Sequence, residues 1–256
     1  MRNWHDRKSN FELIVGRSLP EDRAPCYLGL VHGYDLKPKR RLFELLKQQG
    51  LQANQEVTFL ADGGEEVRAL TEQITPASEH VLDWFHITMR LTVLGQFARG
   101  MAHDDERQSA DFLKSLESIK WLLWHGSFVR AVDAVQRFAE DLDDLQIDYP
   151  QLRKFARAAH EFCVYIESNL DSLINYGERY RAGEPISSSI AESTVNTVIS
   201  KRFAKRQQMQ WTPRGAHLLL QTRTRTLDGT LRPLFERWHP GLATNHANVE
   251  VERAAA

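Results

Sequence analysis

The stretch from Val57 to Ile87 constrains the fold most, because it places two candidate strands on either side of a candidate helix. The first strand, V-T-F-L-A at Val57 to Ala61, combines β-branched and aromatic residues in the way typical of a buried strand. Helical spacing follows over Glu65 to Ile74, and a second apolar run covers His80 to Trp84. Two strands joined by a helical crossover pair in parallel. The stretch therefore predicts a parallel strand pair and an α/β fold.

Asp62 and Asp83 come at the ends of these two strands, so parallel pairing brings both to one edge of the sheet, where α/β sheets bind ligands. Gly63 and Gly64 follow Asp62 and allow a sharp turn and a close approach. Asp62 can present a carboxylate to a divalent metal in this position, or it can be a turn residue that caps the next helix. Asp83 and His86 could both face one cleft; the alternative is a helix cap and a partly buried histidine.

Strands are also predicted before this stretch, and helices dominate after it. Phe11 to Gly16 and Tyr27 to Val31 predict an antiparallel pair. From about residue 101 to 176 apolar residues recur at helical spacing, which predicts an all-α region with Trp121 and Trp124 in its core. The other predicted helices cover Pro38–Lys47, His86–Gly100, Ser187–Ile199, Pro213–Leu227 and Thr230–Trp238.

Glu192 is a second candidate carboxylate, in the first turn of the helix predicted after the break at Gly183 to Pro185. Ser189 and Glu192 fit a capping box, in which the glutamate side chain bonds back to the amide of the cap residue. A capping role and a metal-binding role do not exclude each other, so both remain open.

The charges are unevenly distributed, although the formal net charge is −1. Residues 102–148 carry 11 acidic and 5 basic residues, a balance of −6, whereas Ser193 to Leu227 carries 7 basic residues and no acidic one. These seven are Lys201, Arg202, Lys205, Arg206, Arg214, Arg223 and Arg225. Such a basic arm indicates a polyanionic partner such as nucleic acid, or else a solvated helix face.

Two-metal phosphoryl transfer requires carboxylates that hold the metal ions and basic residues that bind the nucleic acid. Asp62 and Glu192, with a helical region between them and basic residues after them, suggest this arrangement. Carboxylates hold two Mg²⁺ ions about 3.5–4 Å apart, and the ions act on the attacking and leaving oxygens. Basic side chains then neutralise nucleic-acid phosphates.

The chain shows no signal peptide and no apolar run of membrane-spanning length, so we expect no membrane association and a cytoplasmic location. Cys26 and Cys163 lack metal-binding spacing and are expected to be unrelated thiols.

Around Asp62, Asp83 and Glu192 and in the basic arm, the chain resembles the DDE transposases of bacterial insertion sequences, specifically the ISKra group of the Mutator-like class. The matching segments are Asn3–Glu12 (NWHDRKSNFE), Phe59–Gly64 (FLADGG), Leu82–Leu91 (LDWFHITMRL), Ile190–Asn196 (IAESTVN), Lys201–Trp211 (KRFAKRQQMQW) and Arg214–Leu218 (RGAHL). The resemblance covers nearly the whole chain, and the joint order of these motifs is specific.

The resemblance implies an RNase H-like mixed sheet in residues 1–100 and 183–240 and a helical insertion at 101–182. The terminal segment 241–256 is expected to be a disordered tail. The resemblance makes Asp62 the second and Glu192 the third catalytic carboxylate, both metal ligands, and it places Asp83 and His86 near the active site. Lys201, Arg202, Lys205, Arg206 and Arg214 are then DNA-binding residues. The implied reaction is Mg²⁺-dependent cleavage and strand transfer of double-stranded DNA, and Mn²⁺ can substitute for Mg²⁺. The resemblance also implies that the protein is nucleoid-associated and acts as a homo-oligomer on DNA.

One departure concerns the first catalytic aspartate, which the family carries in a strand upstream of the segment that matches Asn3 to Asp6. That strand is absent from this sequence, and Asp6 does not take its role. Because the strand is central in the family's sheet, its loss would leave unpaired edges on both halves. The sequence therefore predicts a truncated, inactive transposase of low stability.

Two other classes of function remain as alternatives. The first is a non-catalytic DNA-binding remnant that docks on DNA or on an intact transposase through the basic arm. The second is a soluble helical protein whose basic face is only solvated.

Overall fold

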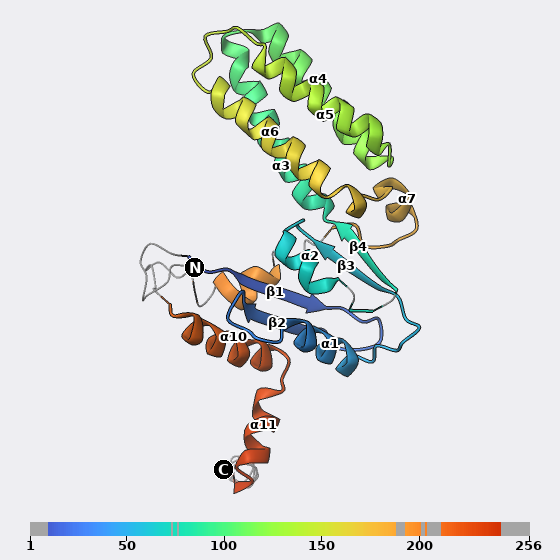
Figure 1. Cartoon of the computed structure of the whole chain (residues 1–256), viewed down its shortest axis with the longest axis vertical. Coiled ribbons are helices and arrows are strands. Elements are labelled where there is room, and N and C mark those ends of the chain that lie inside the picture. Colours follow the sequence, from blue (N-terminus) through green and yellow to red (C-terminus); the bar gives the residue numbers. More distant parts are fainter. Residues whose placement is uncertain are drawn as a thin grey trace, which may run out of the picture. The chain divides into compact units, whose positions relative to one another are not determined.

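The structure of the protein is a computed structural model, and it describes residues 10–72, 74–75, 77–187, 193–200, 203 and 211–241. The chain divides into two compact units, one formed by residues 1–55 and 190–256 and the other by residues 56–189. Figure 1 labels the helices and strands of both units and colours them along the sequence. The described residues form short strands as well as helices, so the predicted mixed α/β class is confirmed. None of the described helices is long and apolar enough to cross a membrane.

The first unit contains an antiparallel hairpin of β1 (Leu13–Ser18) and β2 (Cys26–Val31), which confirms the predicted pairing. Its described helices are α1 (Pro38–Gln48), the π-helical turn η3 (Asn196–Ser200), α10 (Pro213–Leu227) and α11 (Leu231–Trp238). Helix α10 packs on β2, and its Ala216 and Leu220 join Val31 in a small apolar core. Gly29 permits this packing, because a Cβ there would lie only 3.2 Å from the methyl group of Thr224.

The second unit contains the parallel pair β3 (Val57–Ala61) and β4 (Ser78–Leu82), connected by α2 (Glu65–Thr71). The parallel pairing predicted from sequence is confirmed. Strand β4 begins and ends two residues earlier than predicted. It ends at Leu82 because Asp83 caps the next helix instead of continuing the strand. Helix α2 also ends three residues earlier than predicted.

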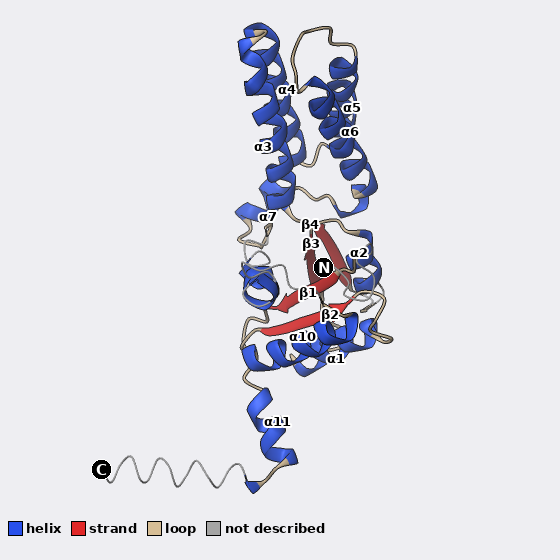
Figure 2. Cartoon of the chain, turned by 90° about the vertical axis from the view of Figure 1, so that its left-hand side faces the viewer, coloured by secondary structure: helices blue, strands red, loops and turns tan. Residues whose placement is uncertain are grey.

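A helical lobe follows β4 and confirms the predicted all-α region. It consists of α3 (Trp84–Gly100), η1 (Met101–His103), α4 (Glu106–Trp124), α5 (Phe128–Asp143), α6 (Leu152–Ser168), η2 (Leu170–Ser172) and α7 (Tyr176–Arg181). Figure 2 shows α3 to α6 lying alongside one another, around a core that includes the stacked rings of Phe97 and Phe155. Trp124 packs against this core as predicted. The prediction for Trp121 is wrong: it is 49% exposed and stacks on His125 at the surface.

The described strands form two separate two-stranded sheets, β1–β2 and β3–β4. The RNase H-like arrangement, which would combine strands of both kinds in one mixed sheet, therefore stays a prediction. The predicted domain boundaries at residues 100, 182 and 240 also stay predictions, and the predicted tail falls outside the described residues beyond residue 241.

Candidate functional site

The parallel pair brings Asp62 and Asp83 to the same edge of the β3–β4 sheet, as the sequence predicted. Ala61 and Leu82 form the last register pair, and the Asp83 amide donates to the Ala61 carbonyl oxygen at 2.8 Å. The two aspartates therefore follow paired residues on adjacent strands. We call Asp62 and Asp83 the carboxylate edge.

Asp62 is exposed, and its Oδ1 accepts a hydrogen bond from the Gly64 amide at 3.1 Å. Gly64 itself is the N-cap of α2, so Asp62 is a turn residue rather than the cap of that helix. Gly63 makes the turn possible with φ +86°, and a Cβ there would lie 2.7 Å from Asn169 Oδ1. Gly64 has an ordinary φ of −64°, so only Gly63 needs the conformational freedom of glycine.

Asp83 is fully buried and caps α3, because its Oδ1 accepts a hydrogen bond from the Phe85 amide at 2.9 Å. Its Oδ2 lies 3.8 Å from His86 Nε2, which is too long for a direct hydrogen bond. The His86 side chain is partly buried. The structure thus gives Asp83 the role of a helix cap beside a partly buried histidine, which was the alternative left open for this motif.

Two tyrosines of the helical lobe hold the carboxylate edge in place. The Tyr165 hydroxyl, from α6, donates to the Asp62 carbonyl oxygen at 3.0 Å, and the Tyr176 hydroxyl, from α7, donates to the Leu82 carbonyl oxygen at 2.8 Å. No motif signals either tyrosine, since they lie 103 and 94 residues away from their partners in the sequence.

The pKa values of these tyrosines reflect their surroundings. Burial raises the pKa of Tyr165 to about 12; the carboxylates of Asp62 and Asp83 add to the rise, and the Arg90 guanidinium opposes it. Burial also raises the pKa of Tyr176, with smaller contributions from Tyr165 and Asp83. Both hydroxyls therefore remain protonated donors at neutral pH.

Within the described ranges, no three His, Cys, Asp or Glu side chains come together as a group that could hold a metal ion. Mg²⁺, however, is commonly bound by one or two carboxylates together with waters and substrate phosphates. The exposed Asp62 carboxylate fits that need, whereas the buried Asp83 carboxylate faces α3. Of the two aspartates, Asp62 is the one whose position suits a metal ligand.

Several predicted site residues lie outside the described residues, namely Glu192 with the capping box, Lys201, Arg202, Lys205 and Arg206. Arg214 is exposed in the first turn of α10, whose Thr212 cap accepts from the Gly215 amide at 3.0 Å. Arg223 of the basic arm is used within the fold, because it donates to the carbonyl oxygens of Thr197 and Val198.

Comparisons of this chain with protein-family models, with curated proteins and with solved structures find no match.

Proposed function

We propose that this chain is part of the catalytic core of a DDE transposase of the ISKra group, with an RNase H-like arrangement, that cleaves and joins double-stranded DNA. The observation that carries the proposal is the exposed carboxylate of Asp62 at the carboxyl end of a strand in a parallel pair. Ligands of open α/β sheets bind at this end of the strands. The motif order gives a second support, since a helical lobe separates Asp62 from Glu192 and the basic arm follows.

In the proposed mechanism, Asp62 and Glu192 bind the metal ions. Mg²⁺, when bound there, would activate the attacking oxygen and stabilise the charge on the leaving oxygen. Tyr165 fixes the Asp62 carbonyl group through its hydroxyl, and Gly63 forms the turn that follows directly after Asp62. Such a rigid attachment keeps the carboxylate in place while a DNA phosphate approaches.

The basic arm supports DNA as the binding partner in this proposal. Exposed arginines such as Arg214 would bind DNA phosphates without reading sequence, so binding should weaken steeply with added salt. The proposal includes assembly of several copies on paired DNA ends, as in the family that the chain resembles.

The test uses purified full-length chain and the genomic DNA that flanks its reading frame on both sides. Cleavage is followed on labelled duplexes with and without Mg²⁺, for the natural chain and for Asp62→Asn. Asp111→Asn is the matched control, because Asp111 is an exposed carboxylate on α4. Mg²⁺-dependent cuts that Asp62→Asn abolishes and Asp111→Asn preserves would support a transposase, and they would contradict the inactivity predicted from the sequence.

A binding titration of the same labelled duplexes at several salt concentrations separates the proposal from the non-catalytic alternative. Salt-sensitive binding without any cleavage favours a DNA-binding remnant. Absence of both binding and cleavage contradicts both, and it leaves a helical protein whose basic face is only solvated.

A further inference from the structure

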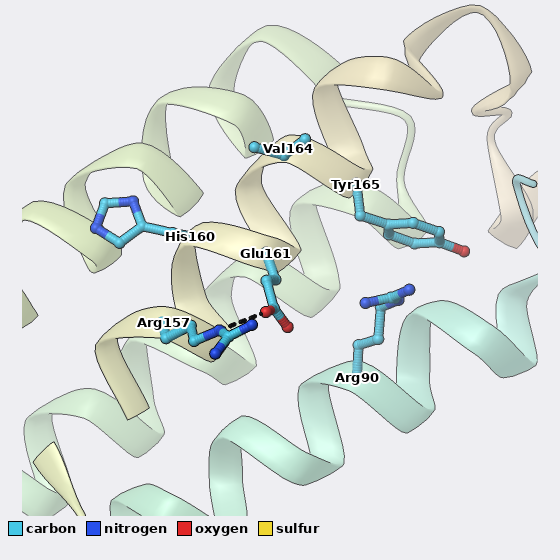
Figure 3. Close-up of a pocket in the computed structure, with 6 residues that line it drawn as sticks. All are labelled: Arg90, Arg157, His160, Glu161, Val164 and Tyr165. Carbon is cyan, nitrogen blue, oxygen red and sulfur yellow. Dashed lines mark hydrogen bonds and ion pairs between the residues drawn. The ribbon is translucent and has the colours of Figure 1, made fainter. Parts of the chain in front are cut away.

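A hollow of about 540 Å³ lies on the helical lobe between α3 and α6, and Figure 3 shows the side chains around it. It is lined by Arg90, Arg157, His160, Glu161, Val164 and Tyr165. Arg90 comes from α3 and the other five residues come from α6. The hollow is thus bounded by two helices of one lobe, and three of its six lining residues are basic.

The basic residues of the hollow differ in what they contact. Arg157 Nε lies 2.9 Å from Glu161 Oε1, and His160 Nε2 lies 2.8 Å from Asp143 Oδ2. Arg90 forms no ion pair with a carboxylate in the part of the chain that the structure describes. Its guanidinium carbon instead lies 4.0 Å from the centroid of the Tyr165 ring. Stacking of this kind holds the guanidinium plane in place and leaves N–H donors on its edge for a ligand.

The position of Arg90 connects the hollow with the carboxylate edge. Arg90 follows His86 by one turn of α3 and Asp83 by two, so the three lie along one side of that helix. The Tyr165 ring that it covers carries the hydroxyl that donates to the Asp62 carbonyl oxygen. The opposing effects of Arg90 and of the two aspartates on the pKa of Tyr165 agree with this proximity.

A positive charge at the position of Arg90 would make the proposed site more favourable for DNA. Carboxylates at the edge repel the phosphates of a DNA strand, and a nearby fixed positive charge offsets this repulsion. Arginine suits the task better than lysine, because its planar fork donates two parallel hydrogen bonds to one phosphate.

We propose that Arg90 binds a backbone phosphate of the DNA strand that enters the carboxylate edge. This inference rests on the proposed function and adds a phosphate-binding residue on the helical lobe to the basic arm. The competing role is purely structural, in which Arg90 only joins α3 to α6 by its stacking on Tyr165.

The experiment measures the affinity of the full-length chain for a labelled DNA duplex by fluorescence anisotropy, over a range of salt concentrations. The variants are Arg90→Met, which keeps an apolar stem against Tyr165, and Arg90→Lys, which keeps the charge. Arg130→Met is the matched control, because Arg130 is an exposed arginine on α5, a helix that does not line the hollow. Thermal unfolding of each variant is recorded in parallel.

We expect Arg90→Met to weaken binding about tenfold, which is the low end for a hydrogen bond to a charged group. The slope of log K against log salt should become shallower by about 0.9, the value for one phosphate contact. Arg90→Lys should restore the slope and part of the affinity, and Arg130→Met should leave both nearly unchanged.

Three other results would overturn the inference, and each has a different consequence for the proposed function. If Arg90→Met binds DNA with the affinity and slope of the natural chain, the inference fails and the proposed function stands. If Arg90→Met and Arg90→Lys lose affinity equally and also melt earlier, the role of Arg90 is structural. If the natural chain binds no DNA, the proposed function fails and the inference falls with it.

Discussion

Replacing Gly63 with alanine should destabilise the protein by roughly 2–5 kcal/mol. The backbone conformation alone, φ +86°, costs a residue with a Cβ about 1–2 kcal/mol. The new methyl group would also lie 2.7 Å from Asn169 Oδ1 and 2.8 Å from Leu82 Cδ1, so both side chains must move. Asn169 is only 2% exposed, accepts a hydrogen bond from Arg68 and donates to the Tyr165 carbonyl oxygen at 2.8 Å. Overpacking and loss of such a bond add about 1–3 kcal/mol.

Urea unfolding followed by circular dichroism measures this loss, and Gly183→Ala separates its two parts. Gly183 has a similar φ of +78°, but a Cβ there meets nothing within 4 Å. Gly183→Ala should therefore cost only the conformational part, about 1–2 kcal/mol. If Gly63→Ala costs no more than Gly183→Ala, the close packing of Asn169 and Leu82 against this turn is not as the structure has it.

Three further predictions concern polar contacts of the second unit. Arg179→Met should lower the free energy of unfolding by about 2–3 kcal/mol in a urea titration, because the arginine is 13% exposed and lies 2.8 Å from both oxygens of Glu79. Tyr176→Phe should cost about 1–2 kcal/mol in the same assay, because the buried Leu82 carbonyl oxygen loses its tyrosine donor. The raised pKa of Tyr165, about 12 against 10.0, means that the folded state binds its proton more tightly than the unfolded state. Its contribution to stability is complete below about pH 10 and disappears as the pH rises towards 12, so Tyr165→Phe should make the urea midpoint less dependent on pH in that range.

The parallel pair could be predicted because its signals are local: a β-rich run, a turn with glycine, helical spacing and a second apolar run. The end of β4 differs from its prediction because the run V-L-D-W-F is apolar on both sides of Asp83. An aspartate inside such a run is itself a signal for the start of a helix, since its side chain can accept from the first free amides. That signal would have placed the boundary where the structure has it.

Trp121 shows that apolar character alone is a poor guide to burial. The buried residues of α4 include Phe112, Leu116, Ile119 and Leu123, which follow one another by four, three and four positions. Trp121 comes two positions after Ile119 and therefore points away from this stripe. The helical spacing of the apolar residues therefore predicts that Trp121 is exposed.

The candidate site was only partly predictable for a different reason. Asp62, Asp83 and His86 sit beside turn and cap signals that can be recognised within a few residues. Tyr165 reaches Asp62 from α6, and that contact depends on how the whole helical lobe packs. Contacts between residues so far apart in the sequence produce no local pattern, so they could not be predicted from this one sequence.

The two aspartates of the carboxylate edge have different roles because they differ in burial. Asp83 is fully buried, and a buried carboxylate is stable only when donors surround it. The Phe85 amide at the start of α3 is one such donor, and the helix dipole there also favours negative charge. If Asp83 turned towards a metal ion, α3 would lose its cap, and α3 carries Arg90. Asp83 therefore acts by fixing the direction in which the helical lobe leaves the sheet, and Asp62 is the carboxylate to which the proposed function assigns the chemistry.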